Sequence, residues 1–130
     1  MTLKILLADD NKTFVTAVNQ FLDMLPGAEV VGLAYDGHEA LTKADELRPD
    51  LVLLDIAMPG LNGLEVARRL HAWPHPPHIV FLSIHDGAAY RDAAHELGAK
   101  GYVGKADFVV ELLPIIERLA MCEPDGNLLC

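Results

Sequence analysis

Basic residues and cysteines are scarce in this chain, and it contains no long hydrophobic run. Its 130 residues carry 10 lysines and arginines against 19 aspartates and glutamates, and no basic stripe is present that would bind nucleic acid directly. The two cysteines, Cys122 and Cys130, argue against a disulfide framework and suit a reducing compartment. No apolar run approaches the roughly 20 residues of a membrane span, and the apolar start is too short for a signal peptide. We therefore expect a cytoplasmic protein without a membrane segment.

Short apolar runs are abundant, and hydrophobic residues make up 52% of the chain with a mean hydropathy of +0.24. The first four runs are continuous rather than alternating, which is typical of strands covered on both faces. The fifth is too short to assign without its context. The runs are Leu3–Ala8, Val30–Ala34, Leu51–Leu54, Ile79–Leu82 and Tyr102–Val103.

Apolar residues at helical spacing follow each run. Helix ends are indicated by Pro26-Gly27, by Arg48-Pro49 and by Gly98. Pro114 interrupts the last stripe, where it predicts a kink or a loosely wound first turn. The stripes are Phe14, Val18, Phe21, Leu22 and Leu25; Ala40, Leu41, Ala44 and Leu47; Leu64, Ala67 and Leu70; Ala89, Ala93, Ala94 and Leu97; and Val109, Leu112, Leu113, Ile116 and Leu119.

The order of elements is therefore a strand followed by a helix, repeated through the chain. This alternation predicts an α/β fold with a parallel sheet and right-handed connections. For five strands we expect the flavodoxin-like order 2-1-3-4-5, with helices on both faces. The histidine- and proline-rich segment 71–78 lacks a helix or hairpin to orient metal ligands, so we interpret it as a surface loop rather than a metal site.

Polar residues collect after the strands. Ligands bind outside the carboxyl ends of such a sheet, where the strand order reverses, here between the first and third strands. Three carboxylates in one crevice repel one another, and a lysine offsets only part of that charge, so a Mg²⁺ ion is expected. A carboxylate there can attack a phosphoryl group, while an ammonium and a hydroxyl hold its oxygens. The residues are Asp9, Asp10, Asp55, Ser83 and Lys105.

A simpler interpretation is that these acids cap helices. Asp10 or Asn11 could cap the first helix, and Asp86 and Asp107 could cap later ones. Capping explains any one acid well. It does not explain why the carboxylates, the hydroxyl and the ammonium all follow strands that meet at one crevice.

Several segments resemble bacterial response-regulator receiver domains over essentially the whole chain. They are Lys4-Ile5-Leu6-Leu7-Ala8-Asp9-Asp10-Asn11, the stretch from Pro49 to Gly63 with its Asp-x-x-Met-Pro-Gly-x-x-Gly signature, Leu82-Ser83, and Gly98 to Lys105. The signature is the most specific of these. The resemblance implies a receiver domain over residues 1–122, followed by a linker or tail at 123–130.

The resemblance also implies roles for individual residues. Asp55 would be the phosphoacceptor, and Asp9 and Asp10 the acidic pair. Mg²⁺ would be held by Asp10, by Asp55, by the backbone carbonyl of Ala57, and by Asp9 through water. Lys105 and Ser83 would bind the phosphoryl group, and Ser83 and Tyr102 would form the switch.

Two positions depart from the usual family pattern. Ala106 follows the lysine where a proline is common, and Ile84 stands where many receivers have alanine. Ile84 is expected to hinder access of water and phosphodonors to Asp55. Both features are similar to receivers that precede a helix-turn-helix DNA-binding domain.

The resemblance also implies which proteins and domains this chain would interact with. A histidine kinase would supply the phosphoryl group, and a DNA-binding output domain beyond Cys130 would receive the signal. We favour an excised receiver over a natural stand-alone one. A homodimer is also allowed, and the chain itself is not expected to be an enzyme.

Three other classes of function share parts of this pattern. A phosphatase of the haloacid-dehalogenase type requires Asp-x-Asp after the first strand, whereas these acids are adjacent. A flavodoxin requires a hydroxyl-rich phosphate loop where Asp9-Asp10-Asn11 stands. A phosphorylation-independent interaction module on the same fold remains the alternative, although no acid of the site is missing.

Overall fold

The computed structural model describes residues 2–84 and 88–120. These residues form a five-stranded parallel sheet in the order β2-β1-β3-β4-β5. The predicted alternation and strand order are therefore confirmed. The strands are β1 (Leu3–Ala8), β2 (Ala28–Ala34), β3 (Leu51–Asp55), β4 (His78–Ser83) and β5 (Gly101–Gly104).

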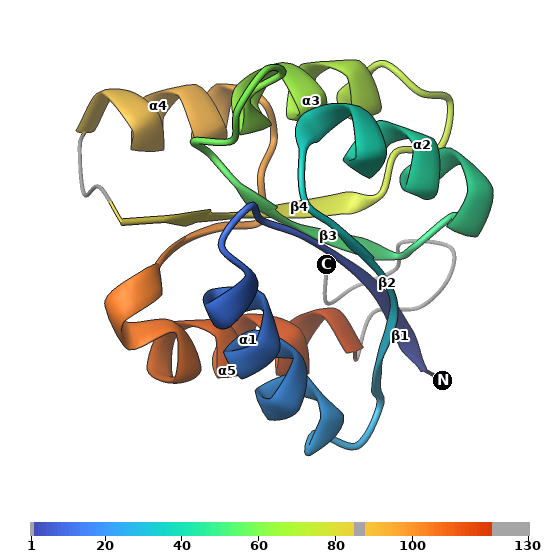
Figure 1. The fold of residues 1–130 in the computed structure, drawn as a ribbon, viewed down its shortest axis with the longest axis vertical. Coiled ribbons are helices and arrows are strands. Elements are labelled where there is room, and N and C mark those ends of the chain that lie inside the picture. Colours follow the sequence, from blue (N-terminus) through green and yellow to red (C-terminus); the bar gives the residue numbers. More distant parts are fainter. Residues whose placement is uncertain (1, 85–87, 121–130) are drawn as a thin grey trace.

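Helices cover both faces of the sheet, with α1 and α5 on one side and α2, α3 and α4 on the other (Figure 1). Two apolar cores result, one under each layer of helices. The three central strands lie between these cores, which explains why their residues are continuously apolar. The helices are α1 (Lys12–Asp23), α2 (Gly37–Leu47), α3 (Gly63–His71), α4 (Ala88–Glu96) and α5 (Phe108–Ala120).

The predicted helix ends agree well with the structure. Gly27 and Gly98 have positive φ angles of 86° and 73°, and Arg48 ends α2 with a left-handed φ of 49° before Pro49. α5 continues through Pro114 instead of starting there. A short 3-10 helix, Lys105–Asp107, precedes α5.

Three residues of the predicted apolar stripes are exposed, and two further predictions concern residues that the structure does not describe. Leu47, Ala89 and Val109 belong to the predicted apolar stripes, but they are exposed in the structure. Each lies in the first or last turn of its helix, and Leu47 still reaches β2, since a Cβ atom on Gly32 would lie 2.6 Å from its Cδ1. The predicted cap at Asp86 and the predicted tail at 123–130 lie outside the described residues.

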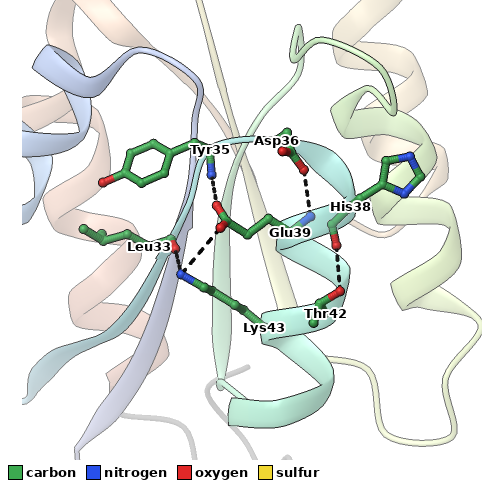
Figure 2. Close-up of polar contacts among 7 residues, drawn as sticks. All are labelled: Leu33, Tyr35, Asp36, His38, Glu39, Thr42 and Lys43. Atoms are coloured by element: carbon green, nitrogen blue, oxygen red, sulfur yellow. Dashed lines mark hydrogen bonds and ion pairs between the residues drawn. The ribbon is translucent and has the colours of Figure 1, made fainter.

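The β2 edge of the sheet is closed by side chains of α2 (Figure 2). Asp9 N–H, just after β1, donates a hydrogen bond to the Ala34 carbonyl oxygen at 3.0 Å, so alternation directs the polar groups of Leu33 and Tyr35 away from the sheet. Glu39 accepts a hydrogen bond from Tyr35 N–H at 2.6 Å, and Lys43 donates one to the Leu33 carbonyl oxygen. These contacts occupy backbone groups that an edge strand otherwise presents to another chain.

Within the described ranges 2–84 and 88–120, no helix has the length and apolar character required to cross a membrane.

Candidate functional site

Three carboxylates meet where the first and third strands end. Ala8 pairs with Leu54 in the ladder, so the residues that follow them emerge side by side. Asp9, Asp10 and Asp55 each offer one oxygen, and these oxygens lie within 4.8 Å of one another. Asp9 and Asp55 are buried, whereas Asp10 is exposed. The crevice predicted between the first and third strands is therefore present, with the expected acids in it.

Lys105 supplies the positive charge of this crevice. Its Nζ lies 2.7 Å from Asp9 Oδ2 and 3.5 Å from Asp55 Oδ2, and its side chain is only 12% exposed. The residue directly follows β5, and the backbone turns into the 3-10 helix at that point. Burial makes these charge interactions stronger than they would be at a surface.

One oxygen of Asp9 is incompletely satisfied. Asp9 Oδ1 accepts a hydrogen bond from Asn11 N–H at 2.9 Å. Among the described residues, Asp9 Oδ2 is the buried side-chain oxygen or nitrogen without a hydrogen bond. Its contact with the Lys105 ammonium at 2.7 Å is an ion pair. A buried oxygen in this state is suited to a further cation or to an ordered water.

Asp55 is a weaker acid than an exposed aspartate. Burial, followed by the negative charge of Asp9, raises its pKa from 3.8 to about 6. Lys105 and the hydrogen bond from Ala57 N–H to Asp55 Oδ1, 3.2 Å long, pull the pKa back down. The carboxylate form of Asp55 is thus costly but still predominates at pH 7 and above.

The capping interpretation applies to only one residue next to the acidic pair. Asn11 caps α1, since its side-chain oxygen accepts a hydrogen bond from Phe14 N–H at 3.1 Å. Asp10 is not the cap residue, and its carboxylate belongs to the acidic cluster. Asp107 lies in the 3-10 helix and does not cap α5 either.

The loop after β3 explains the glycines of the signature. Gly60 has a φ of +71°, which a residue with a side chain rarely adopts. A Cβ atom on Gly63 would lie 2.2 Å from the Asp55 carbonyl oxygen, so only glycine allows α3 to start against the strand end. Asn62 caps α3 by accepting from Glu65 N–H at 3.0 Å. The loop is therefore built to hold the backbone of Asp55 in place.

The remaining predicted residues lie on the β4 and β5 side of the crevice. Ser83 ends β4 and is buried, and it pairs in the ladder with Gly104, just before Lys105. Tyr102 is half-buried in β5, whereas Ile84 is 74% exposed. A cavity of about 260 Å³ is lined by all of these side chains together with Lys105. The structure thus brings every predicted site residue to one end of the sheet.

Three residues near the site were not identified from the sequence. The Arg91 guanidinium lies 4.7 Å from the centroid of the Tyr102 ring, and Glu111 accepts a long hydrogen bond from Gly104 N–H at 3.5 Å. Lys105 Nζ lies 4.8 Å from the centroid of the Phe14 ring. Phe14 had a role only in a helical stripe, and nothing in its spacing indicates a second one.

The histidine-rich segment behaves as a surface loop. His71 ends α3, His75 is exposed in the loop, and His78 begins β4. In the described ranges, the acidic cluster is the single grouping with the arrangement of a metal site, and it contains no histidine. The segment between α3 and β4 is a loop, as predicted, although His71 and His78 belong to the helix and the strand on either side.

Comparisons with known proteins identify a single family. The family model described as the response regulator receiver domain matches residues 5–117 of this chain. The chain is 35% identical over 115 residues to the response regulator GacA of Pseudomonas syringae pv. syringae (strain B728a), which covers 88% of this chain. It is 39% identical over 113 residues to a protein-glutamate methylesterase/protein-glutamine glutaminase of Geobacillus kaustophilus (strain HTA426), which covers 85%.

A solved structure agrees with the sequence matches. The two-component response regulator of the LuxR family from Aurantimonas sp. SI85-9A1 superposes with a TM-score of 0.85 at 32% identity, covering 96% of this chain and 92% of that one. The chain spans only 53% of GacA and 32% of the Geobacillus protein, so the similarity concerns one part of those proteins. With its sheet order, its acidic crevice and these matches, the chain belongs to the response regulator receiver domain family.

Proposed function

We propose that the chain is a phosphorylation-dependent signalling switch that accepts a phosphoryl group on Asp55. The observation that carries the proposal is the cluster of Asp9, Asp10 and Asp55 oxygens within 4.8 Å, with the Lys105 ammonium against two of the three residues. A structural role alone does not account for it, because clustered buried carboxylates cost stability.

The donor set fits a magnesium ion. Oxygen ligands from a few carboxylates, with the remaining positions left to water and phosphate, are what Mg²⁺ prefers. Asp10, Asp55 and the carbonyl of Ala57 would hold it, and Asp9 would act through water. Bound there, Mg²⁺ would offset the negative charge and favour a phosphoryl oxygen. The oxygen of Asp9 that has no hydrogen bond supports a further cation or water in this crevice.

The chemistry of transfer follows from the ionisation of Asp55. Its carboxylate oxygen attacks the phosphorus of a phosphohistidine or of a small donor such as acetyl phosphate. The bond from phosphorus to the donor nitrogen or oxygen breaks, and the donor leaves with its electron pair as an aspartyl phosphate forms. With a pKa of about 6, Asp55 is ionised at pH 7 and needs no separate base. Lys105 and Ser83 hold the oxygens of the transferred group.

Ser83 and Tyr102 relay the phosphorylated state. The phosphoryl oxygens draw the Ser83 hydroxyl inward, and Tyr102 rotates from its half-exposed position toward the space behind it. The cavity of about 260 Å³ that both residues line supports this movement. Ile84, at the same cavity, slows entry of small donors and of water, so the aspartyl phosphate outlasts that of Ile84→Ala. A bias of a few kcal/mol is enough for such a two-state response.

The output is proposed from the relatives. Residues 1–122 form the receiver and 123–130 a linker or tail, in a cytoplasmic transcriptional response regulator that a histidine kinase phosphorylates. The curated relatives extend well beyond the part that matches this chain, which supports an output domain beyond Cys130, and we propose that this domain binds DNA. The chain itself is not an enzyme, although the Geobacillus relative is named as one. A homodimer is also compatible with this proposal.

Intact mass measurement tests this proposal. With acetyl phosphate and Mg²⁺, the wild-type chain should gain one phosphoryl group, and Asp55→Asn should gain none. Asp45→Asn is the matched control, because it makes the same substitution at an exposed aspartate that pairs with Arg48 far from the crevice. Labelling that persists in Asp55→Asn, on a histidine or on Ser83, would overturn the assignment. No labelling of the wild type by acetyl phosphate or by any phosphorylated kinase would favour the phosphorylation-independent interaction module.

A further inference from the structure

The ammonium of Lys105 has an aromatic neighbour besides its two carboxylates. Its Nζ lies over the ring of Phe14, 4.8 Å from the ring centroid. The same atom lies 2.7 Å from Asp9 Oδ2 and 3.5 Å from Asp55 Oδ2. The ammonium is therefore enclosed between an aromatic face and the acidic cluster. A cation at this distance from a ring face is attracted by the ring quadrupole, more strongly where water is excluded.

The ring of Phe14 is itself held in place. It packs edge-on against Phe108, with centroids 5.3 Å apart and an interplanar angle of 78°. Phe108 packs in turn against Phe21 at 5.8 Å and 83°. The backbone of Phe14 is fixed as well, because its N–H donates to the side chain of Asn11, the cap of α1. α1 and α5 thus present the ring to the crevice as a fixed surface.

An aromatic face suits this position for an electrostatic reason. A lysine side chain has a flexible four-carbon stem, so its ammonium needs a contact that selects one conformation. A further carboxylate would bind the ammonium, but it would add negative charge to a crevice that already holds three acids. The face of Phe14 attracts the cation without adding net charge. It also accepts no strong hydrogen bond, which leaves the N–H donors for Asp9, Asp55 and an incoming phosphoryl oxygen.

We propose that Phe14 is a positioning residue that holds the Lys105 ammonium over Asp55. The inference rests on the proposed function for its consequence in phosphoryl transfer, but the placement of Lys105 can be measured separately. Phe14 acts through Lys105 and does not touch the reacting atoms.

Proton NMR of the Lys105 side chain measures this placement without any phosphoryl group or metal. The ring current of Phe14 should shift the Lys105 ε-methylene protons upfield of their usual position. Phe14→Leu should remove that shift, while Phe14→Tyr, which retains the ring, should keep it. Phe21→Leu is the matched control, because Phe21 belongs to the same aromatic group but packs on Phe108 and not on Lys105. The control should keep the shift.

Transfer kinetics measure the consequence. The rate of phosphorylation by acetyl phosphate at saturating Mg²⁺ should fall about fivefold in Phe14→Leu, since Lys105 then occupies other rotamers part of the time. The rate in Phe14→Tyr and Phe21→Leu should stay near that of the wild type. If Phe14→Leu does not fold, Phe14→Met replaces it, as a flexible side chain of similar volume without a ring.

The outcomes separate the two proposals. An unchanged ε-methylene shift and an unchanged rate in Phe14→Leu would overturn the positioning role. An equal loss of rate in Phe21→Leu would overturn it too, because the aromatic group would then act only through folding. A shift lost in Phe14→Leu, together with a wild type that accepts no phosphoryl group, would support the placement by Phe14 and overturn the proposed function.

Discussion

Two lysine–carboxylate groupings in this molecule differ in what their polar atoms do. At the β2 edge, Glu39 and Lys43 are half-exposed, and each is engaged with a backbone group of the strand (Figure 2). In the crevice, Lys105 and two of the acids are largely buried, and the acids outnumber the lysine. The first grouping completes the hydrogen bonding of the fold, whereas the second leaves charge and an oxygen without a hydrogen bond.

This difference distinguishes a functional site from contacts that only stabilise the fold. The β2 edge would be satisfied without any ligand, because each interaction has a partner in the chain. The crevice gains stability only when something positive arrives, or when a carboxylate loses its charge. Substitutions in the two groupings should therefore have unequal effects on stability.

Removal of the crevice lysine should have the largest effect. In metal-free protein, Lys105→Met should lower the free energy of unfolding by about 3 kcal/mol, because it leaves buried carboxylates without their cation. Urea denaturation with and without Mg²⁺ measures the loss, and Mg²⁺ should recover part of it. Lys43→Met at the β2 edge should cost much less and should not respond to Mg²⁺. Equal losses of unfolding free energy in Lys105→Met and Lys43→Met would show that the two groupings do not differ in this way.

The second largest effect should be the dependence of stability on pH that the titration of Asp55 causes. An acid whose pKa rises from 3.8 to about 6 on folding binds its proton more tightly in the folded state, so its contribution to stability is lost as the pH rises between these values. Asp55→Asn avoids this loss. In metal-free protein, its stability relative to the wild type should therefore grow by roughly 2 kcal/mol from pH 4 to pH 7.

Thermal or urea unfolding at several pH values checks this difference. Burial lowers the pKa of His78, which favours folding as the pH rises, but that contribution is common to both proteins and cancels in the comparison. The control is Asp45→Asn, whose stability relative to the wild type should change little over the same range. A flat difference for Asp55→Asn would argue against a raised pKa at this residue.

Magnesium should stabilise the wild type by a smaller amount. At a concentration ten times its dissociation constant, Mg²⁺ should add about 1.4 kcal/mol to the free energy of unfolding. Asp10→Ala should abolish the gain by removing an acid of the cluster. Glu39→Gln removes an equal charge at the β2 edge and should leave the gain intact. Calorimetric unfolding decides, and stabilisation that survives in Asp10→Ala would place the ion elsewhere.

The β2 edge should give the smallest effect. Lys43→Met removes the donor to the Leu33 carbonyl oxygen, and the expected loss is about 1 kcal/mol, the usual value for one hydrogen bond. Phosphorylation of Asp55 should be unchanged, since the edge contributes nothing to the crevice. If Lys43→Met folds normally but is phosphorylated much more slowly than the wild type, the β2 edge and the crevice are not independent.

The sequence carried most of the information about the fold and the acidic crevice. Continuous apolar runs and strand-end acids follow from burial and from parallel topology, and both depend on residue type at short range. For this reason the strand order and the gathering of Asp9, Asp10 and Asp55 could be predicted. Helix stripes were less exact, since Leu47 and Val109 follow the periodic pattern but are exposed in the end turns of their helices.

The contacts that tune the site could not be predicted. Phe14 over Lys105 and Arg91 over Tyr102 join residues far apart in the chain, and a ring face leaves no mark in spacing or charge. The raised pKa of Asp55 depends on the depth of burial and on the distance to Asp9, which are properties of the packed structure. The outermost place of β2 followed from the predicted strand order, but the contacts of Glu39 and Lys43 with its backbone depend on the packed positions of these side chains.

Chemical trapping of the acyl phosphate shows directly whether Asp55 carries the phosphoryl group. Borohydride reduces an aspartyl phosphate to homoserine, which peptide mass spectrometry locates in the sequence. After treatment with acetyl phosphate and Mg²⁺, homoserine should appear at position 55 alone, and it should be absent when either reagent is omitted. Homoserine at Asp9 or Asp10, or an unmodified Asp55 in protein that has gained a phosphoryl group, would contradict the account.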